Sequence, residues 1–143
     1  MELKTRLFGD IEIEETGIIT FEEGIPGFDD VKKYVLLGDP EVSIEWLQGI
    51  EEDVTIPIID PFEIKLDYEF EIPENIEQLL DIKNPDDVIV RTVLVIPENI
   101  KEIRTNLQGP IVINKSAKKG KQLILNEEYP IKYFLHDTKE GVK

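Results

Sequence analysis

The clearest pattern in the chain is a strict alternation of apolar and charged residues over positions 64–72. Every even position is apolar or aromatic, and every odd position is charged. Successive side chains of a β-strand point to opposite faces of a sheet, so this pattern predicts a half-buried strand. Its solvent-facing side would present Lys65, Asp67, Glu69 and Glu71 as a flat acidic face.

Shorter runs rich in valine and isoleucine, separated by glycine, proline and aspartate, predict further strands. These predicted strands are residues 4–8, 17–21, 34–37, 44–47, 55–59, 88–96, 111–114, 122–125 and 131–134. About ten short strands at intervals of about 8–12 residues indicate a barrel or a sandwich. We therefore predict an all-β, mostly antiparallel fold, namely a small closed or partly closed β-barrel-like domain with one or two short helices. Residues 1–143 are expected to form this single domain.

The strongest helix signal lies in residues 73–80, where a proline and acidic residues begin the segment and apolar residues recur at helical spacing. A single turn of helix is predicted over 29–33, and residues 97–104 are ambiguous. Turns are predicted at Gly9-Asp10 and near Lys119-Gly120.

The composition excludes several classes of site. The chain has no cysteine and one histidine, which rules out disulfides, thiolate metal sites and metal sites that need two imidazoles. A serine-histidine-aspartate centre would have to use His136. Adjacent carboxylates are frequent, but neighbours on a strand point to opposite faces and do not converge on a substrate. We predict no enzyme activity, no cofactor and no metal site.

The chain carries no pattern that would direct it to a membrane. Its longest apolar stretch, residues 88–96, is about half of the ~20 residues that a membrane-spanning helix needs. The N-terminal residues 1–6 include acidic and basic residues and lack the apolar run of a signal peptide. These features predict a cytoplasmic protein.

The net charge of −15 is unevenly distributed, since residues 51–87 carry thirteen acidic and two basic residues. Nucleic-acid binding requires basic groups that neutralise phosphates, so this balance disfavours it. The acidic residues are either a solvated surface or a docking field for a basic protein. The basic cluster within residues 115–121 is expected to be a hairpin loop.

The loop at residues 21–28 is unusual because Gly24 and Gly27 enclose a proline, and two phenylalanines enclose the whole loop. Together with segments that follow it in order, it resembles the flagellar assembly factor FliW family. The matching segments are 21–28 (FEEGIPGF), 46–48 (WLQ), 57–62 (PIIDPF), 67–68 (DY), 106–107 (NL) with 110–114 (PIVIN), 121–125 (KQLIL) and 129–131 (YPI). Gly49, Gly109 and Tyr133-Phe134 depart from the expected pattern. Gly49 stands where serine is expected, a change that could alter a loop contact.

The resemblance implies a barrel-like β fold without catalytic activity and two protein partners that bind in a mutually exclusive way. One is flagellin before export, and the other is CsrA, a small dimeric RNA-binding repressor of translation. In this scheme, factor released from flagellin antagonises CsrA allosterically, without competing with RNA, and so relieves repression of flagellin translation. Two alternatives are a flagellin-only export chaperone without CsrA affinity and a small-ligand-binding β-barrel.

Candidate contact residues follow from charge and hydrophobicity. Charge density and the predicted flat face favour six acidic residues for CsrA: Glu51, Glu52, Asp53, Asp67, Glu69 and Glu71. The ends of flagellin are expected to be amphipathic helices, which bind hydrophobic grooves. Phe28, Trp46 and Phe62 are therefore the candidates for flagellin.

Overall fold

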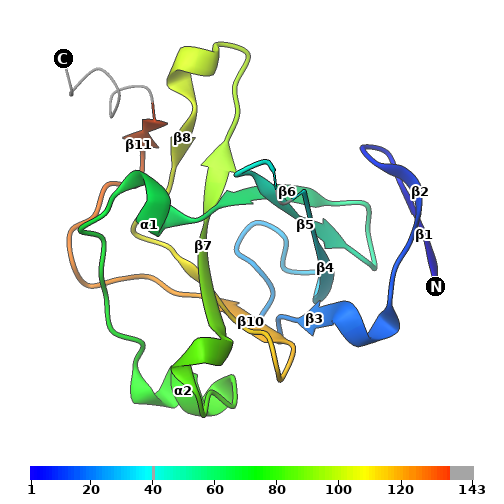
Figure 1. Ribbon diagram of the computed structural model, residues 1–143, viewed down its shortest axis with the longest axis horizontal. Helices are drawn as coiled ribbons and strands as arrows, with labels where there is room; N and C mark the ends of the chain where they lie inside the picture. Colours follow the sequence, from blue (N-terminus) through cyan, green and yellow to red (C-terminus); the bar gives the residue numbers. More distant parts are fainter. Residues whose placement is uncertain (40, 136–143) are drawn as a thin grey trace.

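Seven strands close into a barrel in this computed structural model, which describes residues 1–39 and 41–135. The barrel strands are β3 (Ile18–Thr20), β4 (Lys33–Gly38), β5 (Glu45–Gly49), β6 (Thr55–Ile59), β7 (Val88–Val95), β9 (Ile111–Asn114) and β10 (Lys119–Gln122). Their order is β7-β6-β5-β4-β3-β10-β9, and the pairing of β9 with β7 completes the ring (Figure 1). Neighbours are antiparallel except β3 and β10, which run parallel at Thr20 and Lys119. The predicted fold class is confirmed.

The remaining strands lie outside the barrel. The strands β1 (Glu2–Thr5) and β2 (Gly9–Glu12) form a separate antiparallel hairpin beside it, here called the N-terminal hairpin (Figure 1). The strands β8 (Arg104–Thr105) and β11 (Tyr133–Phe134) extend the sheet from the end of β7. The helical elements are α1 (Pro61–Ile64), α2 (Glu74–Leu79) and the 3₁₀ turns η1 (Glu15–Gly17), η2 (Pro85–Asp87) and η3 (Ile100–Glu102). Within the described residues, no helix is long and apolar enough to cross a membrane.

The barrel interior is filled by one cluster of buried apolar side chains. Its members are Ile19, Phe21, Ile25, Val31, Tyr34, Leu47, Ile56, Ile58, Ile111 and Ile113. The ring of Phe21 packs edge-on against Tyr34 at a centroid distance of 5.4 Å. The Phe21–Phe28 loop therefore begins in the core, and Gly24 and Gly27 adopt positive φ angles that suit glycine.

A second apolar cluster covers the outside of the barrel, between its wall and α2. It contains Tyr68, Ile76, Leu80, Leu107, Val112, Leu123 and Leu125. The strand β9 serves both clusters, because Ile111 and Ile113 face the interior while Val112 faces outward. Asn114 follows on the outward side and donates from Nδ2 to the carbonyls of Leu80 at 2.8 Å and Asp81 at 3.1 Å. These two hydrogen bonds tie the end of α2 to the barrel.

The prediction of a strand over residues 64–72 is wrong. Asp60 caps α1 by accepting a hydrogen bond from the Phe62 N–H, and the segment then turns and continues without strand pairing. Its burial still alternates from Tyr68 onward, because Tyr68, Phe70 and Ile72 pack on the second cluster. Leu66, in contrast, is 89% exposed. The flat acidic sheet face is therefore absent from this segment.

Other boundaries also differ from the sequence prediction. The turn of the N-terminal hairpin lies at residues 6–8, and Gly9-Asp10 begins β2 instead of forming the turn. The strand β8 was not predicted, and β10 begins three residues before the predicted 122–125. Residues 29–33 form no helix. The helix predicted over 73–80 is confirmed by α2. Of the hairpin loop predicted within residues 115–121, the turn lies at 115–118, whereas Lys119 and Gly120 begin β10 and do not form a turn.

Candidate partner-binding surfaces

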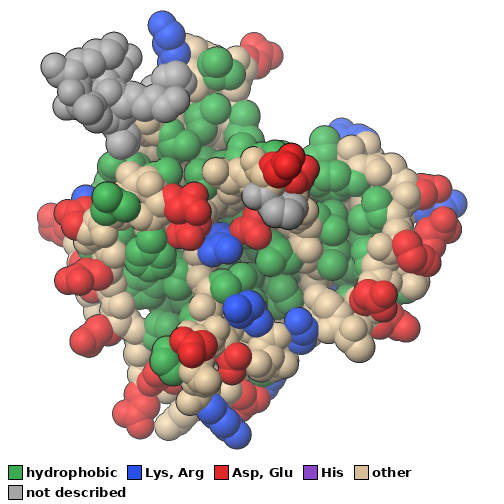
Figure 2. Space-filling view, in the orientation of Figure 1, with side chains coloured by type: hydrophobic (Ala, Val, Ile, Leu, Met, Phe, Trp, Pro, Cys, Tyr) green, Lys and Arg blue, Asp and Glu red, His purple; other side chains and the backbone are tan. Residues whose placement is uncertain are grey.

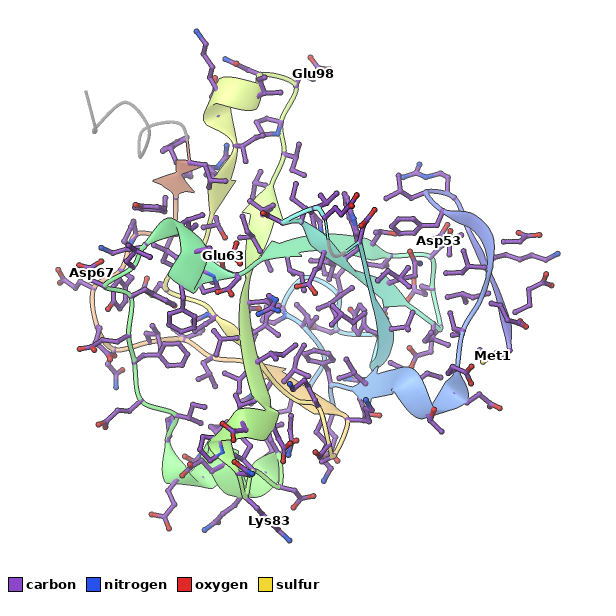
Figure 3. All side chains as sticks on the ribbon, in the orientation of Figure 1. Met1, Asp53, Glu63, Asp67, Lys83 and Glu98 are labelled. Atoms are coloured by element: carbon purple, nitrogen blue, oxygen red, sulfur yellow. The ribbon has the colours of Figure 1, made fainter. Side chains whose placement is uncertain are left out.

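The six acidic candidates do not form one surface. Glu51, Glu52 and Asp53 lie in the loop between β5 and β6, whereas Asp67, Glu69 and Glu71 follow α1. Figure 3 shows Asp53 and Asp67 at opposite sides of the molecule. The single acidic block expected from the sequence is thus divided into two separate groups.

In the β5–β6 loop, two of the three carboxylates hold the backbone in place. Glu51 accepts hydrogen bonds from the N–H groups of Lys32 and Lys33, at 3.1 and 2.9 Å from Oε1. Asp53 accepts one from the Arg6 N–H at 2.9 Å and another from Nε2 of the buried Gln48 at 3.0 Å. These bonds anchor the loop and the N-terminal hairpin. The carboxylate of Glu52, in contrast, forms no hydrogen bond or ion pair with the residues that the structure describes.

Steric contacts explain why position 49 is occupied by glycine. A Cβ atom placed there would lie 2.7 Å from the Glu52 carbonyl oxygen and 3.0 Å from a methyl group of Val31. Both distances are below ordinary van der Waals contact. The conformation of the β5–β6 loop therefore depends on glycine, and serine at this position would require the loop to shift.

In the segment after α1, the three candidate carboxylates differ in whether they are free to contact a partner protein. Asp67 pairs with Lys65 at 2.8 Å, and the hydrogen bond and charge of that lysine lower the pKa of the Asp67 carboxyl. Glu69 and Glu71 are exposed, and their carboxylates form no ion pair within the described part of the chain. The Glu69 backbone is held in place by Tyr129, whose hydroxyl accepts from its N–H and donates to its carbonyl.

The three apolar candidates lie on different elements. Phe28 belongs to the 21–28 loop and is 40% exposed, and Phe62 on α1 is 39% exposed and contacts the ring of Tyr68. Trp46 on β5 is half-buried, with its ring packed edge-on against Phe8 at a centroid distance of 5.9 Å. Of these three residues, Trp46 alone lines one of the hollows described below.

Trp46 lines an apolar hollow, here called the hairpin groove, between the N-terminal hairpin and strands β4 and β5. Figure 2 shows hydrophobic side chains gathered in this region. The groove has a volume of about 460 Å³. Its apolar lining residues are Phe8, Ile11, Leu37, Val42, Ile44 and Trp46, and Glu12, Gly38 and Asp39 complete it.

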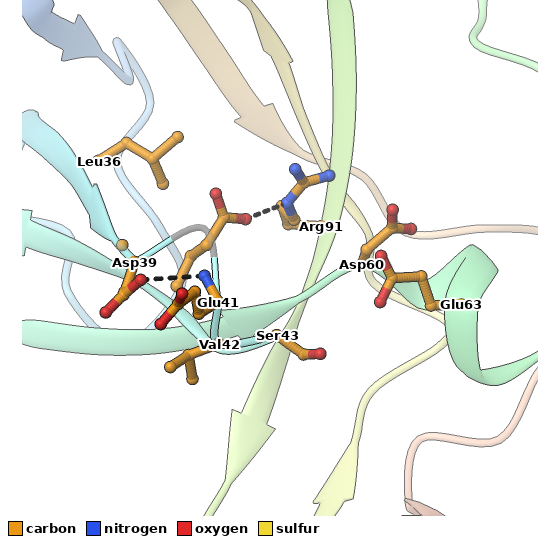
Figure 4. Close-up of a pocket in the computed structure, with 10 residues that line it drawn as sticks. Leu36, Asp39, Glu41, Val42, Ser43, Asp60, Glu63 and Arg91 are labelled. Atoms are coloured by element: carbon orange, nitrogen blue, oxygen red, sulfur yellow. Dashed lines mark hydrogen bonds and ion pairs between the residues drawn. The ribbon is translucent and has the colours of Figure 1, made fainter.

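A second hollow, here called the acidic hollow, lies on the other side of the loop that follows β4. Its volume is about 520 Å³ (Figure 4). The charged residues that line it are Asp39, Glu41, Glu45, Asp60, Glu63 and Arg91. Arg91 donates to Glu45 from Nε and to the Val90 carbonyl from Nη1 at 2.8 Å. In the described residues, no group of acidic or histidine side chains is arranged to hold a metal ion.

Sequence reasoning missed both hollows because their residues come from several separate segments. No local pattern links Phe8 to Trp46 or Glu45 to Arg91. His136, the residue that a serine-histidine-aspartate centre would need, lies outside the described residues.

Comparison with known proteins decides the family. The family model described as FliW protein matches residues 2–135. The chain belongs to the FliW family. Over 138 residues it is 44% identical to the flagellar assembly factor FliW of Caldicellulosiruptor saccharolyticus, covering 95% of this chain and 91% of that protein. The FliW protein of Thermosipho africanus is 44% identical over 141 residues, covering 96% of this chain and 97% of that one.

A solved FliW structure confirms the architecture. The crystal structure described as that of the flagellar assembly factor FliW superposes with a TM-score of 0.87 at 36% identity, covering 94% of this chain and 96% of that one. The resemblance seen in the sequence segments is therefore confirmed over nearly the whole chain. The relatives are named as assembly factors and not as enzymes.

Proposed function

We propose that this FliW protein binds flagellin in the cytoplasm and, when released from it, binds and antagonises the translational repressor CsrA. The two partners bind in a mutually exclusive way. Export of flagellin therefore releases the protein, and only the released protein binds CsrA. Binding to CsrA acts allosterically, without competition for the RNA-binding surface. Family membership supports the assembly role, and the charge of the chain supports the choice of a basic partner.

The observation that carries the CsrA part of the proposal is the set of uncommitted carboxylates on a chain of net charge −15. An RNA-binding repressor carries positive charge to hold phosphates, and an acidic protein complements it. Acidic groups docked beside the RNA site would also repel incoming phosphates. The exposed carboxylates of Glu69 and Glu71, close to Asp67, form the favoured contact, because those of Glu51 and Asp53 are bound to backbone and side-chain donors.

Titration calorimetry of the protein against CsrA from the same bacterium tests this proposal. We expect binding that weakens as salt rises and that disappears when the protein is first saturated with flagellin. Heat with flagellin but none with CsrA would leave the export chaperone as the function. If the protein bound neither CsrA nor flagellin, the proposed function and the export-chaperone alternative would both be refuted.

Charge reversal tests the contact surface separately. The double variant Glu69→Lys and Glu71→Lys should slow association with CsrA and reduce its dependence on salt. The matched control is the double variant Glu98→Lys and Glu102→Lys, which reverses two exposed acids on the connection after β7; Glu98 lies away from Asp67 in Figure 3. Equal association rates for the double variant and the control would contradict the assignment of this surface.

A further inference from the structure

The hairpin groove is an exposed apolar surface with no occupant among the described residues. Six of its nine lining residues are apolar, and Val42 at its edge is 51% exposed. Apolar side chains exposed singly are common, but a continuous apolar hollow marks a site of interaction. The volume of about 460 Å³ lies within the usual range for binding sites, roughly 300–1,000 Å³.

The two walls of the groove are fixed relative to one another by specific contacts. The Phe8 ring contacts Trp46, and the Arg6 N–H donates to Asp53, so the hairpin is attached to the barrel at the turn end. Within that turn, the Thr5 hydroxyl accepts from the Phe8 N–H and donates to the Gly9 carbonyl, both at 2.8 Å. A groove held in this way need not be ordered during binding, which lowers the entropic cost of association.

The charges around the groove select a basic occupant. Glu12 and Asp39 line the groove itself, and Asp39 also lines the acidic hollow next to it. Gly38 and Val42 are shared by both hollows, so the two form adjoining parts of one surface. Among the described residues that line the two hollows, Arg91 is the one basic residue, and Glu45 already pairs with it.

We propose that the hairpin groove binds a basic amphipathic helix of flagellin. Apolar side chains of that helix enter between Phe8 and Val42, and its lysine or arginine side chains meet Asp39 and the acidic hollow. The inference rests on the proposed function, since flagellin is the partner whose ends are expected to be amphipathic helices. Anchors at i, i+3, i+4 and i+7 of such a helix span about 10 Å along one face.

Trp46 is a built-in reporter for this site, because it is the single tryptophan of the chain and lines the groove. Two probes are used: purified flagellin, and a synthetic helix of about 18 residues with leucine on one face and lysine elsewhere. Binding of either probe should shift Trp46 emission to shorter wavelength. A third peptide, with glutamate in place of every lysine, should bind at least about tenfold more weakly.

The variant Val42→Lys places a positive charge at the edge of the groove, where the side chain is already exposed and folding is least affected. It removes an apolar contact and repels a basic helix, so it should weaken flagellin binding at least about tenfold. Leu66→Lys is the matched control, because Leu66 is 89% exposed and lines neither hollow. The control should stay within about twofold of the unaltered protein.

The outcomes separate the groove from the proposed function. Equal binding of flagellin by the unaltered protein and by Val42→Lys would overturn the groove assignment and leave flagellin binding intact. If the lysine peptide binds, Val42→Lys abolishes that binding and flagellin does not bind at all, the groove is supported as a site for basic helices and flagellin is refuted as the partner. Equal affinity for the lysine and glutamate peptides would overturn the charge argument, and no binding of any probe would overturn the site.

Discussion

The contact between Gly120 and Phe21 gives the sharpest test of the barrel core. Gly120 lies on β10, directly opposite Ile113 of β9, and has a φ angle that any residue can adopt. A Cβ atom at this position would lie 2.5 Å from Cζ and 2.6 Å from Cε2 of Phe21. Carbon atoms normally pack at about 3.5–4.0 Å, so the variant Gly120→Ala creates an overlap of about 1 Å.

The ring of Phe21 has no room to yield. Its side chain is fully buried, and it packs edge-on against Tyr34, which is also fully buried. Extra atoms in a well-packed core typically cost about 1–3 kcal/mol and sometimes more. We expect Gly120→Ala to lower the free energy of unfolding by about 2–3 kcal/mol, at the upper end of that range because the overlap is with a rigid ring.

Urea denaturation followed by far-UV circular dichroism measures this change. Gly17→Ala is the matched control, since a Cβ at Gly17 would have no atom within 4 Å. That control should not lower the stability, because alanine is less flexible in the unfolded chain and meets no clash in the folded one.

A double variant identifies the cause. Phe21→Leu removes the ring atoms that the new Cβ would strike, so Phe21→Leu combined with Gly120→Ala should cost at least about 1 kcal/mol less than the sum of the single changes. Additive costs, or a Gly120→Ala variant as stable as the parent, would refute the steric reasoning.

Two further predictions concern buried hydroxyls and acid stability. The Tyr68 hydroxyl donates to the Leu107 carbonyl at 2.5 Å, whereas the Tyr34 hydroxyl has no partner among the described residues and burial raises its pKa to about 12. Urea denaturation should therefore show that Tyr68→Phe lowers the free energy of unfolding by about 1–2 kcal/mol, whereas Tyr34→Phe leaves it unchanged or raises it. Equal losses for the two variants would contradict this reasoning. Hydrogen bonds from Lys121 and Lys119, together with their charges, lower the pKa values of the Glu23 and Asp81 carboxyls. A carboxyl with a lowered pKa stabilises the fold above its unfolded pKa of about 4, and that contribution is lost as the pH falls through the folded pKa. The urea midpoint measured from pH 6 to pH 2 should then fall less steeply for Asp81→Asn than for the unaltered protein, and identical slopes would exclude the ion pair as a contributor.

Several elements were predictable because their pattern depends on burial alone. The run 55–59 became β6 and the run 111–114 became β9 with the predicted bounds. The strand β9 is buried on both faces, and its first three residues, Ile111, Val112 and Ile113, form a continuous apolar run that is visible in the sequence. The helix α2 was also predictable, because its proline start and apolar spacing are local properties.

Elements defined by their partners were not predictable. The strands β2 and β8 exist because they pair with β1 and β7, and neither carries an apolar alternation of its own. At residues 64–72, in contrast, a strand was predicted and none forms, although apolar and charged residues alternate there more strictly than in any strand of the structure. Asp60 and Pro61 start a helix just before this segment, and no neighbouring strand supplies backbone partners for it.

The sequence by itself determined the barrel class, the family and the large negative charge, because these depend on periodicity, motif order and composition. Only the tertiary structure decided which charges are available to a partner. Glu51 and Asp53 are held by backbone donors from residues 19 and 47 positions away, so their role as anchors has no local signature. The hairpin groove likewise joins side chains of β2, β4 and β5, and such a surface exists only after distant strands have been packed together.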